Sequence, residues 1–112
     1  GDSQEPWFVA DKLVESNKII AVQGDHQMLY HNSLIADDVH WIDDAPKFPL
    51  NCSAKIRYRQ ASQECTVKIE DDKTIKVHFN NSQRAITPGQ SIVFYDSDNC
   101  LGGSVIKSRA NE

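Results

Sequence analysis

Residues 50–59, LNCSAKIRYR, alternate between apolar and polar side chains without interruption. Successive side chains of a β-strand point to opposite faces, so a period of two predicts a strand with one buried face and one solvated face. The apolar face would carry Leu50, Cys52, Ala54, Ile56 and Tyr58. The polar face would carry Asn51, Ser53, Lys55, Arg57 and Arg59. We therefore expect a half-buried strand with a row of three cations on its outer face.

The residues before this strand also predict β-structure. Residues 7–10 and 18–22 are short apolar runs, and the Ser-Asn pair within residues 14–17 favours a turn between them. Together they predict a hairpin. Residues 33–42 could begin as a helix, but their valine and tryptophan fit an extended strand at least as well, so we expect a strand there.

The residues that follow the strand at 50–59 predict a second hairpin. Residues 65–69 and 75–79 alternate on either side of a charged turn at 70–73, and Asn80-Asn81 is expected to turn the chain again.

A third pair of strands is expected at the C-terminal end. A Pro-Gly turn within residues 85–90 precedes an unbroken apolar run at 91–95, which is typical of a strand buried on both faces or closing a barrel. Residues 96–99 predict a turn and residues 100–106 a last strand. The adjacent glycines of that strand, Gly102 and Gly103, indicate a bulge, a sharp bend or the close approach of another backbone.

Length and composition fit one small domain. The chain has 112 residues, of which 39% are hydrophobic and 25% charged. Seven or eight short strands with little helix predict an all-β barrel or sandwich. No apolar run approaches the roughly 18 residues of a membrane span, so we expect no membrane partner.

Charge is divided unevenly along the chain. Residues 1–50 hold nine acids and three bases, a net charge of −6, whereas residues 51–112 hold seven acids and nine bases, a net charge of +2. A basic second half permits one face to meet phosphate while the rest repels it. A uniform nucleic-acid-binding surface is not expected.

The cysteines predict neither a disulfide framework nor a zinc site. Cys52, Cys65 and Cys100 are odd in number, with spacings of 13 and 35 residues. Residues 1–6 lack the basic and apolar regions of a signal peptide. Reduced thiols in a reducing, cytoplasmic location are therefore expected.

Catalytic and metal-binding patterns are not apparent. The histidines have no partners at metal-ligand spacing. Neighbouring aspartates such as Asp71-Asp72 would point to opposite faces of a strand, which disfavours acid/base pairs. The glycine pair lacks the lysine and the helix of a nucleotide loop. We expect no catalytic residue and no metal ligand in this chain.

The cation row is the most informative feature. On a strand, Lys55, Arg57 and Arg59 would recur about every 6.5 to 7 Å, a spacing that can follow successive phosphates. Tyr58 could direct its ring or hydroxyl at a nucleotide, although alternation places it on the apolar face. The alternative interpretation is an exposed strand face that charge keeps soluble.

The sequence resembles the C-terminal portion of the tRNA-specific 2-thiouridylases, or tRNA-uridine 2-sulfurtransferases, over essentially residues 6–106. The matching segments include residues 6–9 (PWFV), 32–36 (NSLIA), 40–41 (HW), 57–60 (RYRQ), 65–67 (CTV), 85–91 (AITPGQS), 93–96 (VFYD) and 100–103 (CLGG). Their common order makes the resemblance specific. Two departures are Ser104 and Ser97, where family members often have glycine.

This resemblance implies a parent enzyme that adenylates the wobble uridine of tRNA with ATP and magnesium, then replaces its 2-oxygen with persulfide sulfur. The nucleotide loop and the catalytic cysteines of the family lie in an N-terminal domain, which no segment of this chain matches. The fragment alone is therefore expected to be inactive and to hold no cofactor, and its three cysteines are not expected to be catalysts.

The resemblance also implies two structural units and a set of tRNA contacts. Residues 1–30 would be a remnant of the central domain, containing the hairpin, and residues 31–112 a small antiparallel β-barrel like those of elongation factors. The Arg57-Tyr58 pair and Gln90 match family positions that contact tRNA, and Lys55 and Arg59 extend that set by their place in the cation row.

Two functions from different classes remain. The first is a tRNA-contacting domain that positions its substrate for a catalytic domain. The second is a protein-interaction barrel that docks the catalytic domain or a sulfur-donor protein through the acidic first half, because acidic surfaces favour basic partners.

Overall fold

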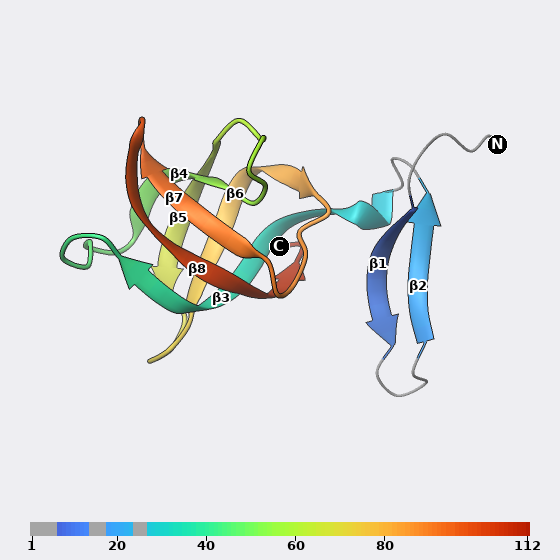
Figure 1. Ribbon diagram of the computed structural model, residues 1–112. Helices are drawn as coiled ribbons and strands as arrows, with labels where there is room; N and C mark the ends of the chain where they lie inside the picture. The colour runs from blue at the N-terminus through green and yellow to red at the C-terminus, as the bar shows by residue number, and fades with distance from the viewer. Residues whose placement is uncertain (1–6, 14–17, 24–26) are drawn as a thin grey trace.

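The computed structural model describes the backbone of residues 7–13 and 18–23 and all of residues 27–112. Six strands form one closed barrel in the order β3-β6-β5-β4-β7-β8, and every pair of neighbours is antiparallel (Figure 1). The barrel strands are β3 (Tyr30–Trp41), β4 (Leu50–Lys55), β5 (Gln63–Ile69), β6 (Ile75–Arg84), β7 (Ser91–Asp96) and β8 (Asn99–Ala110). The prediction of an all-β barrel is confirmed, and closure through β3 and β8 excludes a sandwich.

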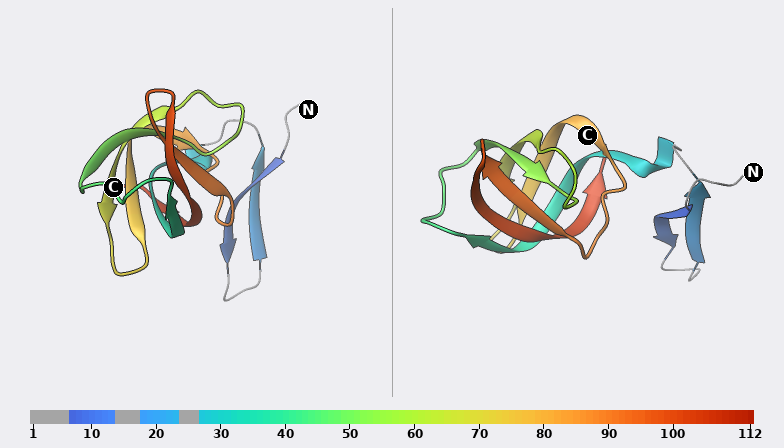
Figure 2. Two further views of the ribbon diagram at one scale, coloured as in Figure 1. Left: turned by 60° about the vertical axis from the view of Figure 1, so that its left-hand side comes forward. Right: turned by 45° about the horizontal axis from the view of Figure 1, so that its top comes forward.

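The predicted N-terminal hairpin is present. Strand β1 (Trp7–Leu13) pairs antiparallel with β2 (Lys18–Gln23), with a register shift between Val9 and Asp11. The turn expected at residues 14–17 lies outside the described residues. A 3-10 turn, η1 (Gln27–Leu29), leads into β3 (Figure 2). The amide of Ala85 donates to the carbonyl of Leu29 at 2.7 Å, so η1 is joined to the barrel.

The barrel interior is filled by apolar side chains from the inward-facing positions of the strands. Strand β3, predicted over residues 33–42, supplies Leu34 and Ala36, and β7 supplies Ile92 and Phe94. The members of this core that are at most 1% exposed are Leu34, Ala36, Ala54, Val67, Val77, Phe79, Ile86, Ile92, Phe94 and Ile106. Burial of an aliphatic side chain stabilises a fold by about 1.5 to 3 kcal/mol. The hydrophobic core therefore needs no disulfide.

The adjacent glycines produce both a bulge and a close backbone approach, as predicted. Strand β8 shifts register between the partners of Phe94 and Tyr95. A Cβ on Gly102 would lie 2.1 Å from the carbonyl oxygen of His40, which is far inside contact distance. Only glycine therefore allows β8 to pass β3 at this bend. Nearby, Ser104 donates its hydroxyl to the carbonyl of Asp37 at 2.5 Å.

Two predicted boundaries are wrong. Strand β4 ends at Lys55 rather than continuing to residue 59, and β6 runs through Asn80-Asn81 to Arg84 rather than turning there. The tail of β6 pairs with the start of β3, and a register shift between His31 and Ser33 absorbs the extra residues. Tertiary pairing thus overrides the local turn preference of asparagine.

The described residues contain neither a candidate membrane-crossing helix nor a candidate metal-binding cluster. No helix there combines the length and apolar character that a membrane crossing requires. No group of three or more His, Cys, Asp or Glu side chains in the same residues is placed to hold a metal ion.

Candidate nucleic-acid interface

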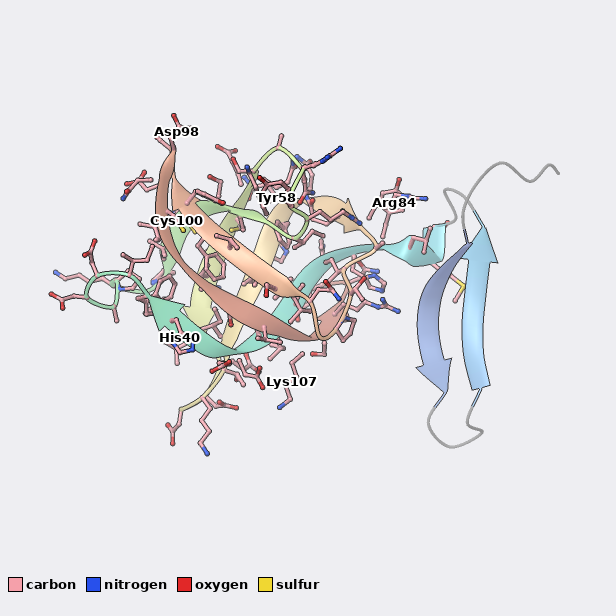
Figure 3. The ribbon with its side chains drawn as sticks, viewed as in Figure 1. His40, Tyr58, Arg84, Asp98, Cys100 and Lys107 are labelled. Carbon is pink, nitrogen blue, oxygen red and sulfur yellow. The ribbon has the colours of Figure 1, made fainter. Side chains whose placement is uncertain are left out.

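A groove of about 700 Å³ lies between the turn after β4 and the segment that joins β6 to β7. Tyr58 and Arg84 mark the same side of the barrel, away from His40 and Lys107 (Figure 3). The groove is lined by Lys55, Ile56, Arg57, Tyr58, Ala85, Thr87, Gln90, Ser91, Val93 and Tyr95. Four of the five predicted contact residues, Lys55, Arg57, Tyr58 and Gln90, thus share one surface. Arg59 is exposed but is not among the lining residues.

The predicted cation row is replaced by a turn. After β4 ends, the amide of Gln60 donates to the carbonyl of Arg57 at 3.3 Å. The side chain of Gln60 accepts from the amide of Ile56 at 3.0 Å and donates to Gln83 at 2.9 Å. Because Gln60 satisfies these groups, the chain leaves the strand at this point.

Because of this turn, Tyr58 lies on the outside of the molecule, contrary to the prediction from alternation. Alternation places its ring on the apolar face of a strand, but the side chain is 93% exposed. An aromatic ring at the tip of a turn presents both faces to solvent, so it is available for stacking on a ligand.

Arg57 links the turn after β4 to the end of β6, a contact that we call the Arg57 brace. Its Nη2 donates to the carbonyl of Arg84 and, at 3.4 Å, to the carbonyl of Ala85. Partial burial lowers the pKa of Arg57, and the nearby positive charge of Arg84 lowers it further, but a guanidinium keeps its charge in proteins. Arginine has five N–H donors, so about three remain for a ligand. The expected bidentate grip on phosphate must therefore use Nη1 and Nε.

Lys55 and Gln90 occupy two other parts of the groove. The ammonium of Lys55 lies 5.2 Å from the ring centroid of Tyr95, within cation–π range. Gln90 is exposed and follows a tight turn in which its amide donates to the carbonyl of Thr87 at 3.1 Å. Gly89 supplies the φ of +92° that this turn needs. The carbonyl of Gln90 accepts from Ile106 at 2.8 Å, so its backbone is fixed.

The sequence did not single out Thr87, Ser91 and Tyr95 as part of this surface. Residues 91–95 were predicted as a strand buried on both faces or closing a barrel. Strand β7 lies in the closed barrel between β4 and β8, but of residues 91–95 only Ile92 and Phe94 are buried. Ser91, Val93 and Tyr95 line the groove. A period-two interpretation of these five residues would have found that outward face.

None of the three cysteines lines this groove. Cys52 and Cys65 are cross-strand partners in β4 and β5, with their sulfur atoms 3.9 Å apart, and all three cysteines are free. The neighbouring Cys52 thiol and burial raise the pKa of Cys65 above its ordinary value. A buried thiol of raised pKa is a poor nucleophile.

The glycine pair does not form a phosphate cradle. Gly102 faces the backbone of β3 at contact distance, which leaves no space for a phosphate group. The described residues therefore do not fit ATP at that position. The groove presents cationic groups, an exposed aromatic ring, and amide and hydroxyl donors. Groups of these kinds make the contacts to phosphate, sugar and base in nucleic-acid complexes.

The chain is similar to known proteins over most of its length. The family described as the aminomethyltransferase beta-barrel domain matches residues 31–106. The tRNA-specific 2-thiouridylase MnmA of Ruthia magnifica subsp. Calyptogena magnifica is 60% identical over 109 residues, which are 97% of this chain and 30% of that protein. The enzyme of the same name from Francisella philomiragia is 53% identical over 103 residues, 90% of this chain and 29% of that protein.

The Aeromonas hydrophila protein of that name is 47% identical over 108 residues, covering 96% of this chain and 29% of the relative. The chain thus spans about 30% of the length of the curated relatives it matches. It belongs to the aminomethyltransferase beta-barrel domain family, in the form found as the C-terminal part of tRNA-specific 2-thiouridylases.

Proposed function

We propose that this chain is the tRNA-contacting C-terminal domain of an enzyme that 2-thiolates the wobble uridine of tRNA. The observation that supports it best is the convergence of Lys55, Arg57, Tyr58 and Gln90 on one groove, although 35 positions separate the first from the last. The names of the relatives supply the substrate class.

In this proposal the groove positions RNA without reacting with it. Lys55 and the free donors of Arg57 meet phosphates, which fix register and orientation but carry no sequence information. Tyr58 stacks on an unpaired base, and the amide of Gln90 reaches sugar or base. The chemistry takes place in the parent's N-terminal domain, which would hold ATP with magnesium and the catalytic cysteines.

Domain boundaries and partners follow from the same proposal. Residues 1–30 would belong to the parent's central domain and residues 31–112 to the barrel, which accords with β3 beginning at Tyr30 and the family match beginning at residue 31. The parent would work in the cytoplasm with tRNA and a protein that delivers persulfide sulfur. The isolated chain would be inactive.

Mapping the contact surface tests the proposal. In an NMR titration with unmodified tRNA at low salt, the backbone amides of Thr87, Gln90 and Ser91 should shift strongly. Amides of the β5–β6 turn, such as that of Lys73, should not. Shifts confined to the β5–β6 turn, or none at all at millimolar tRNA, would rule out the groove as the RNA site.

A further inference from the structure

The groove that contains Lys55, Arg57, Tyr58 and Gln90 is called the RNA groove below, and a second groove, which we call the acidic groove, lies apart from it. The acidic groove has a volume of about 460 Å³, and none of its lining residues belongs to the RNA groove. Val39, Trp41, Phe48 and Ile69 form its apolar part, and Asp38 and Asp72 contribute to its rim. His40, next to Asp38, marks this end of the barrel, well apart from Tyr58 (Figure 3).

The floor of the acidic groove is rigid and partly open to solvent. The rings of Trp41 and Phe48 pack with centroids 6.1 Å apart, and Trp41 also packs on the buried Phe94 at 5.5 Å. Ile69 is 57% exposed at the end of β5. A single exposed isoleucine is ordinary, but here it adjoins two partly buried aromatic rings in one concavity.

The charge around this groove is negative. Its lining includes Asp38, Asp71 and Asp72 and one lysine, Lys73, a net charge of −2, and the segments 37–47 and 69–74 that supply most of the lining carry −5 in total. Asp71 accepts from the amides of Lys73 and Thr74, both at 2.9 Å, which lowers its pKa and keeps it ionised at neutral pH. Such a field repels nucleic-acid phosphates and attracts cationic groups.

We propose that the acidic groove docks a segment of a partner protein in which an apolar side chain is flanked by lysine or arginine. The apolar side chain enters between Phe48 and Ile69, and the flanking cations meet the rim aspartates. Charge complementarity selects this occupant over RNA. It also disfavours a symmetric dimer through this end, because two copies would bring like charges together.

A labelled peptide provides the probe. Fluorescence anisotropy should detect binding of a labelled peptide that carries Leu-Phe between pairs of arginines. Two control peptides separate the contribution of charge from that of the apolar side chains. Replacing the arginines with glutamates, or Leu-Phe with Gly-Gly, should each weaken binding at least tenfold. The proposal would be overturned if either control peptide bound as tightly as the arginine-flanked Leu-Phe peptide. It would also be overturned if the arginine-flanked Leu-Phe peptide failed to bind at millimolar concentration.

Matched variants locate the binding site. Ile69→Ser should weaken peptide binding at least fivefold, whereas Ile42→Ser should not, because Ile42 is 65% exposed but does not line the groove. The double variant Asp38→Asn/Asp72→Asn keeps side-chain shape and should reduce both the affinity and its salt dependence. Equal losses for the two isoleucine variants would contradict the assignment.

Two further outcomes would reassign the groove. Concentration-dependent sedimentation that Ile69→Ser abolishes would indicate a second copy as the occupant, and chemical-shift changes on tRNA addition that map to Ile69 would indicate RNA. The proposal is independent of tRNA binding, because Ile69→Ser should leave tRNA affinity unchanged. Its failure would therefore not affect the function proposed for the other groove.

Discussion

The guanidinium of Arg57 donates to the backbone carbonyl of Arg84 and thereby ties the turn after β4 to the end of β6. The two residues are 27 positions apart in the sequence, and Arg57 and Ala85, the residue after Arg84, line the RNA groove. Arg57 therefore has two roles in this account. It shapes the groove through Nη2 and contributes charge through its other donors.

The two roles of Arg57 can be separated with lysine. Arg57→Lys keeps the charge but has only three donors, all on one nitrogen, so it cannot hold both carbonyls and also make a bidentate contact with phosphate. We expect tRNA affinity to fall about fivefold, equivalent to roughly 1 kcal/mol, the usual worth of a hydrogen bond. Amide hydrogen exchange at Gln60 should become faster. An unchanged exchange rate would show that the brace does not order the turn.

Tyr58 should contribute stacking energy without stabilising the fold. Tyr58→Ala should weaken binding of an unpaired oligoribonucleotide by about 1 to 3 kcal/mol, the range measured for base–aromatic stacking. Tyr58→Phe should retain most of the affinity, because the ring remains. The melting temperature of both variants should match the wild type, since the side chain is 93% exposed. If phenylalanine weakened binding as much as alanine, the hydroxyl rather than the ring would make the contact.

Gly102 should be indispensable to the barrel. Gly102→Ala would place a Cβ 2.1 Å from the carbonyl of His40, so β8 must shift. Overpacking typically costs about 1 to 3 kcal/mol, and we expect the upper end of that range here because backbone must move. Gly103→Ala is the matched control, because its Cβ would lie 3.2 Å from the carbonyl of Ile92 and should cost less. Urea denaturation measures both, and equal midpoints would contradict the close approach.

The thiol pair should make stability fall at alkaline pH. Cys65 has a pKa raised in the folded state by Cys52 and by burial, so the folded protein keeps a proton that the unfolded chain releases above its ordinary thiol pKa, about 8.5. The hydrogen bond between the two thiols also lowers the pKa of Cys52, which acts in the opposite direction near and below the ordinary thiol pKa. The loss of stability is therefore expected above that pH, at up to about 1.4 kcal/mol per pH unit. Cys65→Ala should flatten the dependence between pH 8.5 and 10. An unchanged slope would assign the dependence to other groups.

Alternation predicted much of this fold because one face of nearly every barrel strand is buried. Ile75, Val77 and Phe79 all occupy the interior as period two requires. The pattern failed where non-local pairing ended or extended a strand. Gln60 satisfies backbone and side-chain partners that no local propensity encodes, so β4 stops at Lys55.

The candidate site was likewise predictable only in part. Lys55, Arg57, Tyr58 and Gln90 were identified from the sequence, with the resemblance supplying the expected role of three of them. Their arrangement was not predictable, because it depends on where β4 ends and on the Arg57 brace. The acidic groove escaped notice for a related reason. Residues 37–47 and 69–74 are adjacent only after the barrel closes.

The salt dependence of tRNA binding tests the central claim most directly. Lys55→Ala/Arg57→Ala and Lys73→Ala/Lys107→Ala remove two cations each, so both double variants carry a formal net charge of −6 instead of −4. The second pair lies outside the RNA groove. The first should weaken binding strongly and reduce the slope of log affinity against log salt by about 1.8, or 0.9 for each lost phosphate contact. The second should leave the slope unchanged, and equal slopes for the two variants would contradict binding of tRNA in the groove.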